Sequence, residues 1–115
     1  NKRLFPDQVV RNGTKSCVVP YATPGLPLRE AIKKSVEDFM GRNGFFPKLI
    51  LLKNHGIITT GASVKECTVS TLMCEKSAEI FIGAKLLNNM QFLTPQEVAA
   101  VDTNPSEKYR RELYK

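Results

Sequence analysis

Residues 50–61 read ILLKNHGIITTG and contain the only histidine of the chain, His55. The apolar run 49–52 predicts a buried strand, and the β-branched run 57–60 predicts a second one. His55 stands at the polar break between them, after Asn54, which could anchor a turn, and before Gly56, which leaves room for a close approach. The stretch therefore predicts two strands joined at an imidazole that the end of a strand holds firmly.

Upstream of this stretch the pattern predicts a helix, with Pro27 in its first turn and Gly41 or Gly44 at its end. Apolar residues recur at helical spacing: Leu28, Ala31, Ile32, Val36, Phe39 and Met40. The preceding segment PYATPGLP, residues 20–27, is predicted to be a loop. Earlier still, 9–10 and 17–19 are predicted as two short strands joined by a type I′ turn at Asn12-Gly13.

Downstream, Ser63 and Glu66 form a capping-box pattern that opens a long helix over 64–87. Thr94 and Glu97 form a second one, and Pro105 begins a last, polar helix. Strands that alternate with helices predict α/β layers. We expect one partial domain over 1–115, with a core over 6–88 and a helical extension over 94–115.

Composition excludes several classes of protein. The chain has 115 residues, a net charge of +6 and 42% hydrophobic residues, without an apolar run near the roughly 20 residues that span a membrane. Basic residues alternate with acidic ones rather than forming a stripe, so we expect neither a nucleic-acid nor a membrane partner. The three cysteines, an odd number without a CxxC pair, fit a reducing cytoplasm, and the positive charge favours a phosphorylated substrate.

Three blocks in order carry a resemblance to a known family: VPYATPGLPLREAI, LILLKNHGIITTGASVKEC and EKSAEI. Together they resemble the C-terminal half of the class II aldolase/adducin head family, over roughly residues 6–87. Sugar-phosphate aldolases such as fuculose- or rhamnulose-phosphate aldolase belong to it. The resemblance implies a three-layer α/β/α fold on a mixed, largely antiparallel sheet. It also implies a homotetramer with active sites between subunits.

The resemblance further implies a zinc ion, or another divalent metal, with His55 as one of its three histidine ligands. Tyr21 resembles a proton donor that reaches the neighbouring subunit's site, although Pro20 stands where those aldolases have an arginine. The implied reaction is reversible cleavage of a ketose 1-phosphate to dihydroxyacetone phosphate and an aldehyde. The H-x-H ligand pair, the catalytic glutamate and the phosphate-binding residues belong to the family's other half, so we expect this chain to be a fragment without a complete site.

Alternatives to this interpretation stay open. The parent protein could be a sibling sugar-phosphate epimerase or dehydratase that uses the same metal site. It could also be a non-catalytic interaction module, as the adducin head is. Without the resemblance, His55 would be read as a structural residue, and Tyr21 as a packed loop residue whose hydroxyl meets a backbone carbonyl.

Overall fold

A computed structural model describes residues 2–113 and contains a three-stranded sheet in the order β1-β2-β3. The strands are β1 (Cys17–Val19), β2 (Leu49–Leu52) and β3 (Gly56–Thr59). β1 lies parallel to β2, with Val19 opposite Leu52, whereas β2 and β3 form an antiparallel hairpin. The sheet is therefore mixed, and the two strands expected around His55 are confirmed.

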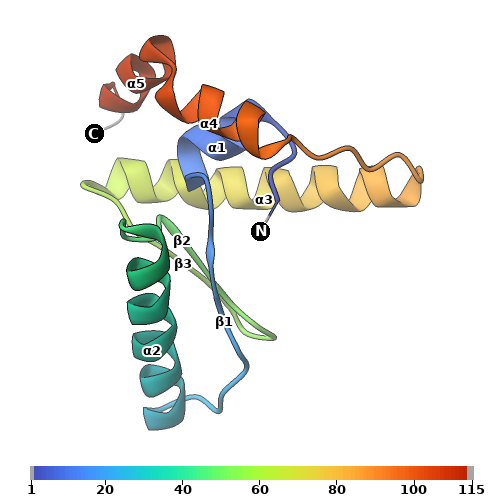
Figure 1. Ribbon diagram of the computed structural model, residues 1–115. Coiled ribbons are helices and arrows are strands. Elements are labelled where there is room, and N and C mark those ends of the chain that lie inside the picture. Colours follow the sequence, from blue (N-terminus) through green and yellow to red (C-terminus); the bar gives the residue numbers. More distant parts are fainter. Residues whose placement is uncertain (1, 114–115) are drawn as a thin grey trace.

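Helix α2 (Leu26–Asn43) connects the two parallel strands and covers one face of the sheet (Figure 1). It ends at Gly44, whose φ of 75° is left-handed and whose N–H donates to the Met40 carbonyl at 2.8 Å. The core lies between this helix and the sheet, and its buried members are Cys17, Val19, Phe39, Ile50 and Leu52. The helix expected from the apolar spacing is thus confirmed, and it runs from Leu26 to Asn43.

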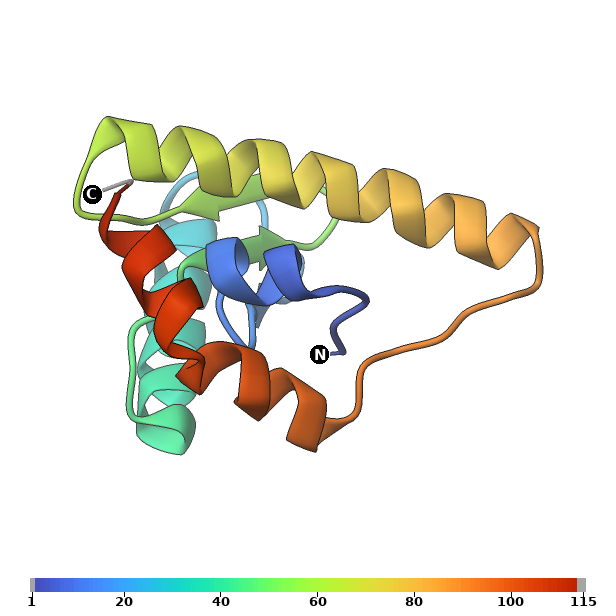
Figure 2. The same cartoon turned by 90° about the horizontal axis from the view of Figure 1, so that it is seen from above.

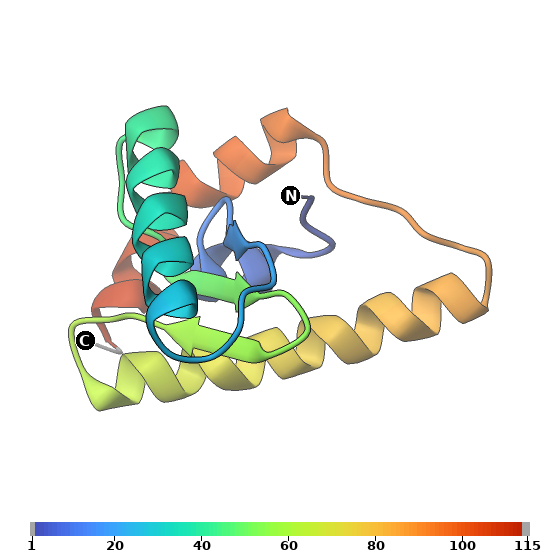
Figure 3. The same ribbon diagram turned by 90° about the horizontal axis from the view of Figure 1, so that it is seen from below.

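Helix α3 (Val64–Leu86) lies on the opposite face, so the sheet is enclosed between α2 and α3 in the three-layer arrangement that the resemblance implied (Figure 3). The Thr59 and Thr71 hydroxyls meet at 3.0 Å between β3 and this helix. At its start the Ser63 hydroxyl accepts from the Glu66 N–H at 3.1 Å. The Glu66 carboxylate accepts from the Ala62 N–H instead of that of Ser63, and it also pairs with Lys48 at 3.1 Å.

Helices α4 (Pro95–Thr103) and α5 (Pro105–Glu112) follow, and α1 (Pro6–Asn12) lies between α3 and α4 (Figure 2). The expected capping box at α4 is confirmed in both directions, with Thr94 N–H to the Glu97 carboxylate at 2.8 Å and Glu97 N–H to the Thr94 hydroxyl at 3.2 Å. The Thr94 N–H and the Thr94 hydroxyl both donate to the Glu97 carboxylate and lower its pKa. None of the described helices is both long and apolar enough to cross a membrane.

The expected strand at 9–10 and its hairpin turn are wrong, because residues 6–12 form helix α1. Pro6 at the first helical position and Asp7 in the first turn are helix-start signals, and the Gln8 side chain accepts from the Leu4 N–H at 2.8 Å. Val9 and Val10 are both buried by packing, which outweighs their strand propensity. Asn12-Gly13 ends a helix here, with Gly13 at a φ of 78°.

The hairpin turn 53–55 requires an unusual backbone at its centre. Asn54 has a φ of 56°, in the left-handed region that asparagine tolerates better than most residues. The His55 N–H donates to the Leu52 carbonyl at 3.1 Å and closes the turn. The direction in which the chain leaves β2 therefore depends on Asn54.

Replacing Phe39 with alanine should lower the free energy of unfolding by about 3–5 kcal/mol, because the ring fills the core between α2 and the sheet. Its ring also meets that of Phe45 edge-on at 5.4 Å. Phe46→Ala is the matched control, since that ring is half exposed, and it should cost no more than about 1 kcal/mol. Urea unfolding followed by circular dichroism measures both; equal losses would contradict the assignment of the core.

Asn54→Val should lower the unfolding free energy by roughly 1–2 kcal/mol, because a β-branched residue disfavours the left-handed region. Asn54→Gly should stay within about 1 kcal/mol of the unmodified chain, since glycine adopts that conformation freely. Lys53→Val, on the same turn and outside the left-handed region, serves as the control. The same urea experiment applies, and a larger loss for Lys53→Val than for Asn54→Val would argue against this strain.

Candidate active site

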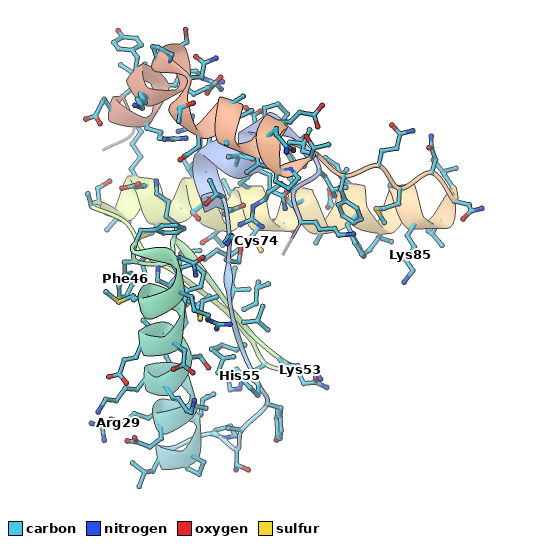
Figure 4. All side chains as sticks on the ribbon, viewed as in Figure 1. Arg29, Phe46, Lys53, His55, Cys74 and Lys85 are labelled. Atoms are coloured by element: carbon cyan, nitrogen blue, oxygen red, sulfur yellow. The ribbon has the colours of Figure 1, made fainter. Side chains whose placement is uncertain are left out.

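His55 lies at the exposed end of the β2–β3 hairpin, in the turn that Asn54 shapes (Figure 4). Its backbone is held by the hydrogen bond to Leu52, while its imidazole is open to the surroundings. A histidine in such a place has a fixed position and a free side chain, which are what a ligand to an external group needs. Within residues 2–113 the imidazole has no hydrogen-bond partner.

Tyr21 is brought to the same edge of the sheet by the parallel pairing of β1 and β2. Val19, the last residue of β1, lies opposite Leu52, the last residue of β2. The Lys53 N–H continues this ladder by donating to the Val19 carbonyl at 3.0 Å. The loop that follows β1 and the turn that follows β2 therefore leave the sheet side by side. The carboxyl ends of parallel strands are where α/β proteins place their ligands.

The Tyr21 phenol is 59% exposed and makes no hydrogen bond to the described part of the chain. The alternative that this tyrosine is packed, with its hydroxyl on a backbone carbonyl, is therefore not what the structure has. The tyrosine and the histidine share one edge without touching each other through a hydrogen bond.

The described residues contain no ready-made set of three metal ligands. No group of three or more histidine, cysteine, aspartate or glutamate side chains gathers anywhere in residues 2–113. A catalytic zinc site takes three protein ligands and keeps one position open. His55 could supply one of these three ligands, and residues 2–113 do not bring two others to it.

Gly56 lies in open space, since a Cβ atom built on it would meet nothing within 4 Å among the described residues. The close approach expected there is therefore not made by this part of the chain. The cysteines lie away from the edge: Cys17 is in the core, and Cys74 is on α3, near the opposite end of the sheet (Figure 4). Burial raises the pKa of both thiols, which keeps them protonated at neutral pH.

Sequence reasoning missed one charged group of interest, the buried Arg3. The residue is only 4% exposed, and it lines a cavity whose lining includes neither Tyr21 nor His55. A single arginine outside any motif gives no pattern to recognise. The strand predicted at 9–10 does not include Arg3, so no predicted element placed its side chain.

Comparison with known proteins shows which family the chain resembles. The profile of the Class II Aldolase and Adducin N-terminal domain matches residues 3–82. The 3-oxo-tetronate 4-phosphate decarboxylase of Haemophilus influenzae is 33% identical over 96 residues, which make up 81% of this chain and 40% of that protein.

Two solved structures share the fold. YgbL of Klebsiella pneumoniae, a candidate aldolase/epimerase/decarboxylase, has a TM-score of 0.69 and 29% identity over 87% of this chain and 44% of YgbL. YgbL of Escherichia coli has a TM-score of 0.67 over 90% of this chain and 45% of its own, and at 24% identity it supports the fold alone. The chain thus spans less than half the length of these relatives. Since the family profile covers most of it, the chain belongs to the class II aldolase and adducin family.

Proposed function

We propose that this chain is the part of a metal-dependent enzyme that supplies one metal ligand, His55, and one proton donor, Tyr21. The observation that carries the proposal is their placement on one sheet edge by the pairing of Val19 with Leu52. The enzyme would break a carbon–carbon bond beside a carbonyl group in a small phosphorylated sugar derivative. The remaining ligands would come from residues outside this chain.

The favoured reaction is decarboxylation of a 3-oxo sugar-acid phosphate. The similarity to the decarboxylase of Haemophilus influenzae supports it, at 33% identity over 81% of this chain. Loss of carbon dioxide leaves an electron pair on the carbon next to the carbonyl. A divalent metal, when bound, supplies a Lewis acid for such charge. The product carbon then needs a proton, and an exposed phenol such as Tyr21 could give it.

Reversible aldol cleavage of a ketose 1-phosphate, giving dihydroxyacetone phosphate and an aldehyde, is the second candidate. Its support is the family membership itself and the aldolase alternative carried by YgbL of Klebsiella pneumoniae. Both reactions develop the same charge beside a carbonyl, so one metal ligand and one proton donor serve either. An epimerase or dehydratase would share this chemistry, whereas an adducin-like interaction module would need neither group.

A homo-oligomer, as the tetramer expected from the resemblance, would give Tyr21 a partner. The phenol is exposed and makes no hydrogen bond in residues 2–113, so a neighbouring subunit's site could receive it. The net charge of +6 would favour the phosphate of the substrate. A reducing cytoplasm would suit the three free cysteines.

In the full-length parent, His55→Ala should remove the metal and the activity together, because the variant loses a ligand. Tyr21→Phe should keep the metal and lose about 10²–10⁴-fold in kcat, because only the proton donor is removed. Tyr109→Phe is the matched control, since that tyrosine is 67% exposed on α5, and it should change neither. Metal content by plasma mass spectrometry and initial rates on the same samples give both readouts.

The two reactions are separated by their products on the same preparation. Carbon dioxide release from 3-oxo-tetronate 4-phosphate would support the decarboxylase, and dihydroxyacetone phosphate release from a ketose 1-phosphate would support the aldolase. Unchanged metal content in His55→Ala would remove the histidine from the site. A parent without metal and without either activity would favour the interaction module.

A further inference from the structure

The segment before α1 contains a buried positive charge without a carboxylate partner. Arg3 is 4% exposed, and its guanidinium donates from Nε to the Gly13 carbonyl at 2.8 Å and from Nη2 to the Ser16 hydroxyl at 2.9 Å. Both acceptors are neutral, and no ion pair reaches this arginine within residues 2–113. Buried charges are ordinarily paired, because an unpaired one costs several kcal/mol, a rough estimate.

The ionisation of this group agrees with its surroundings. Burial lowers the pKa of Arg3 to about 10, and the neighbouring Cys74 acts weakly in the opposite direction. The guanidinium therefore stays charged at neutral pH. Of its five N–H groups, two are engaged, which leaves donors for another acceptor.

A buried acceptor without a partner lies near Arg3, at the end of α1. The Asn12 amide donates from Nδ2 to the carbonyl and the hydroxyl of Ser70, each at 2.8 Å. Its Oδ1 is buried and has no partner among the described residues, although the residue is only 1% exposed. A buried acceptor of this kind calls for an N–H or O–H donor.

Arg3 and Asn12 line the same cavity, of about 500 Å³, between the sheet and α3. Its apolar wall comes from the sheet face opposite α2 and from α3, with Val18, Leu49, Leu51, Ala78 and Phe81 as members. Val18 is 58% exposed there, although the two strand residues that flank it are buried in the core. The lining includes two cations, Lys2 and Arg3, and neither an aspartate nor a glutamate.

We infer that this cavity seats an apolar polypeptide segment whose carboxylate pairs with Arg3. The segment comes from the part of the family domain that lies outside this chain. The relatives support this source, since this chain spans 40% of the Haemophilus decarboxylase and 44% of YgbL of Klebsiella pneumoniae. The inference rests on family membership and not on the proposed reaction.

Charge and shape both favour such an occupant. A carboxylate offers two coplanar oxygens that match the remaining N–H groups of a guanidinium. A polypeptide backbone also brings N–H groups, one of which satisfies Asn12 Oδ1. Apolar side chains on both sides of the acidic residue cover Val18 and Leu51. A small free acid would fill only the polar corner of the cavity.

The test is a titration of the isotope-labelled 115-residue chain with two capped tripeptides, acetyl-Val-Glu-Val-amide and acetyl-Val-Gln-Val-amide. Nuclear magnetic resonance follows the Arg3 Nε–H and the backbone amide of Val18, which report on the polar and apolar walls. We expect the glutamate peptide to bind about tenfold or more tightly than its neutral isostere. Acetate and 3-hydroxybutanoate, titrated in parallel, represent a free small acid.

Three variants locate the effect. Arg3→Met should abolish the preference for glutamate, whereas Arg3→Lys, which keeps the charge, should retain part of it. Arg29→Met is the matched control, because that arginine is exposed at the far end of α2 (Figure 4), and it should leave the preference unchanged. If Arg3→Met does not fold, the spectrum shows it, and the peptide pair on the unmodified chain with Arg3→Lys decides.

Each remaining outcome overturns part of the inference. Equal affinity for the two peptides would show that no carboxylate pairs with Arg3. Tighter binding of 3-hydroxybutanoate than of the glutamate peptide would show that the cavity binds a small free acid and not a polypeptide. No shift at either reporter up to about 10 mM, a Kd range too weak for any specific site, would remove the site altogether. Loss of catalytic activity in the parent bears on none of these results, so the proposed function fails or stands separately.

Discussion

The parallel pairing of β1 with β2 is the contact on which the rest of the structure depends. It aligns Val19 with Leu52, and the Lys53 N–H extends it by one more hydrogen bond. A parallel pair needs a crossover connection, which is why α2 runs between the strands and covers one face. The same alignment buries Cys17 and Val19 against Ile50 and Leu52. Without it, neither the core nor the shared edge of Tyr21 and His55 would exist.

The two faces of the sheet are covered by helices to different degrees. The face toward α2 is closed by Phe39 and the small and branched side chains around it. On the other face, α3 meets only part of the sheet. Val18 remains exposed, Asn12 Oδ1 has no partner among the described residues, and Arg3 has no carboxylate partner there. Apolar side chains of α3 are exposed as well, with Leu86 at 81%. The relatives, of which this chain spans 40–44%, contain further chain that could cover such surfaces.

Two short connecting segments of the sheet position the residues of the candidate site. A hairpin turn fixes the backbone of His55, and a loop between β1 and α2 presents Tyr21. Each side chain is positioned by regular structure but is itself free, as groups that act on an external molecule must be. No group of three metal-ligating side chains gathers around them in residues 2–113, and the chain belongs to the class II aldolase and adducin family.

The sequence by itself determined the elements whose signals are local. Regular apolar spacing gave α2, paired capping residues gave the starts of α3 and α4, and the strands around His55 followed from two runs of branched and aliphatic residues. Three ordered blocks also indicated the family. Each of these signals acts within one or two helical turns or one strand, where neighbouring residues decide the conformation.

Only the tertiary structure decided the rest. Val9 and Val10 became part of a helix because α3 and α4 bury them there, and local propensity did not reveal that burial. The shared edge of Tyr21 and His55 depends on a strand register between residues more than thirty positions apart. The unpaired Arg3 depends on which acceptors the folded chain brings to it. Such contacts join residues that are far apart in the sequence and form only when the chain packs. The order of residues along the chain therefore does not reveal which acceptors surround a buried charge.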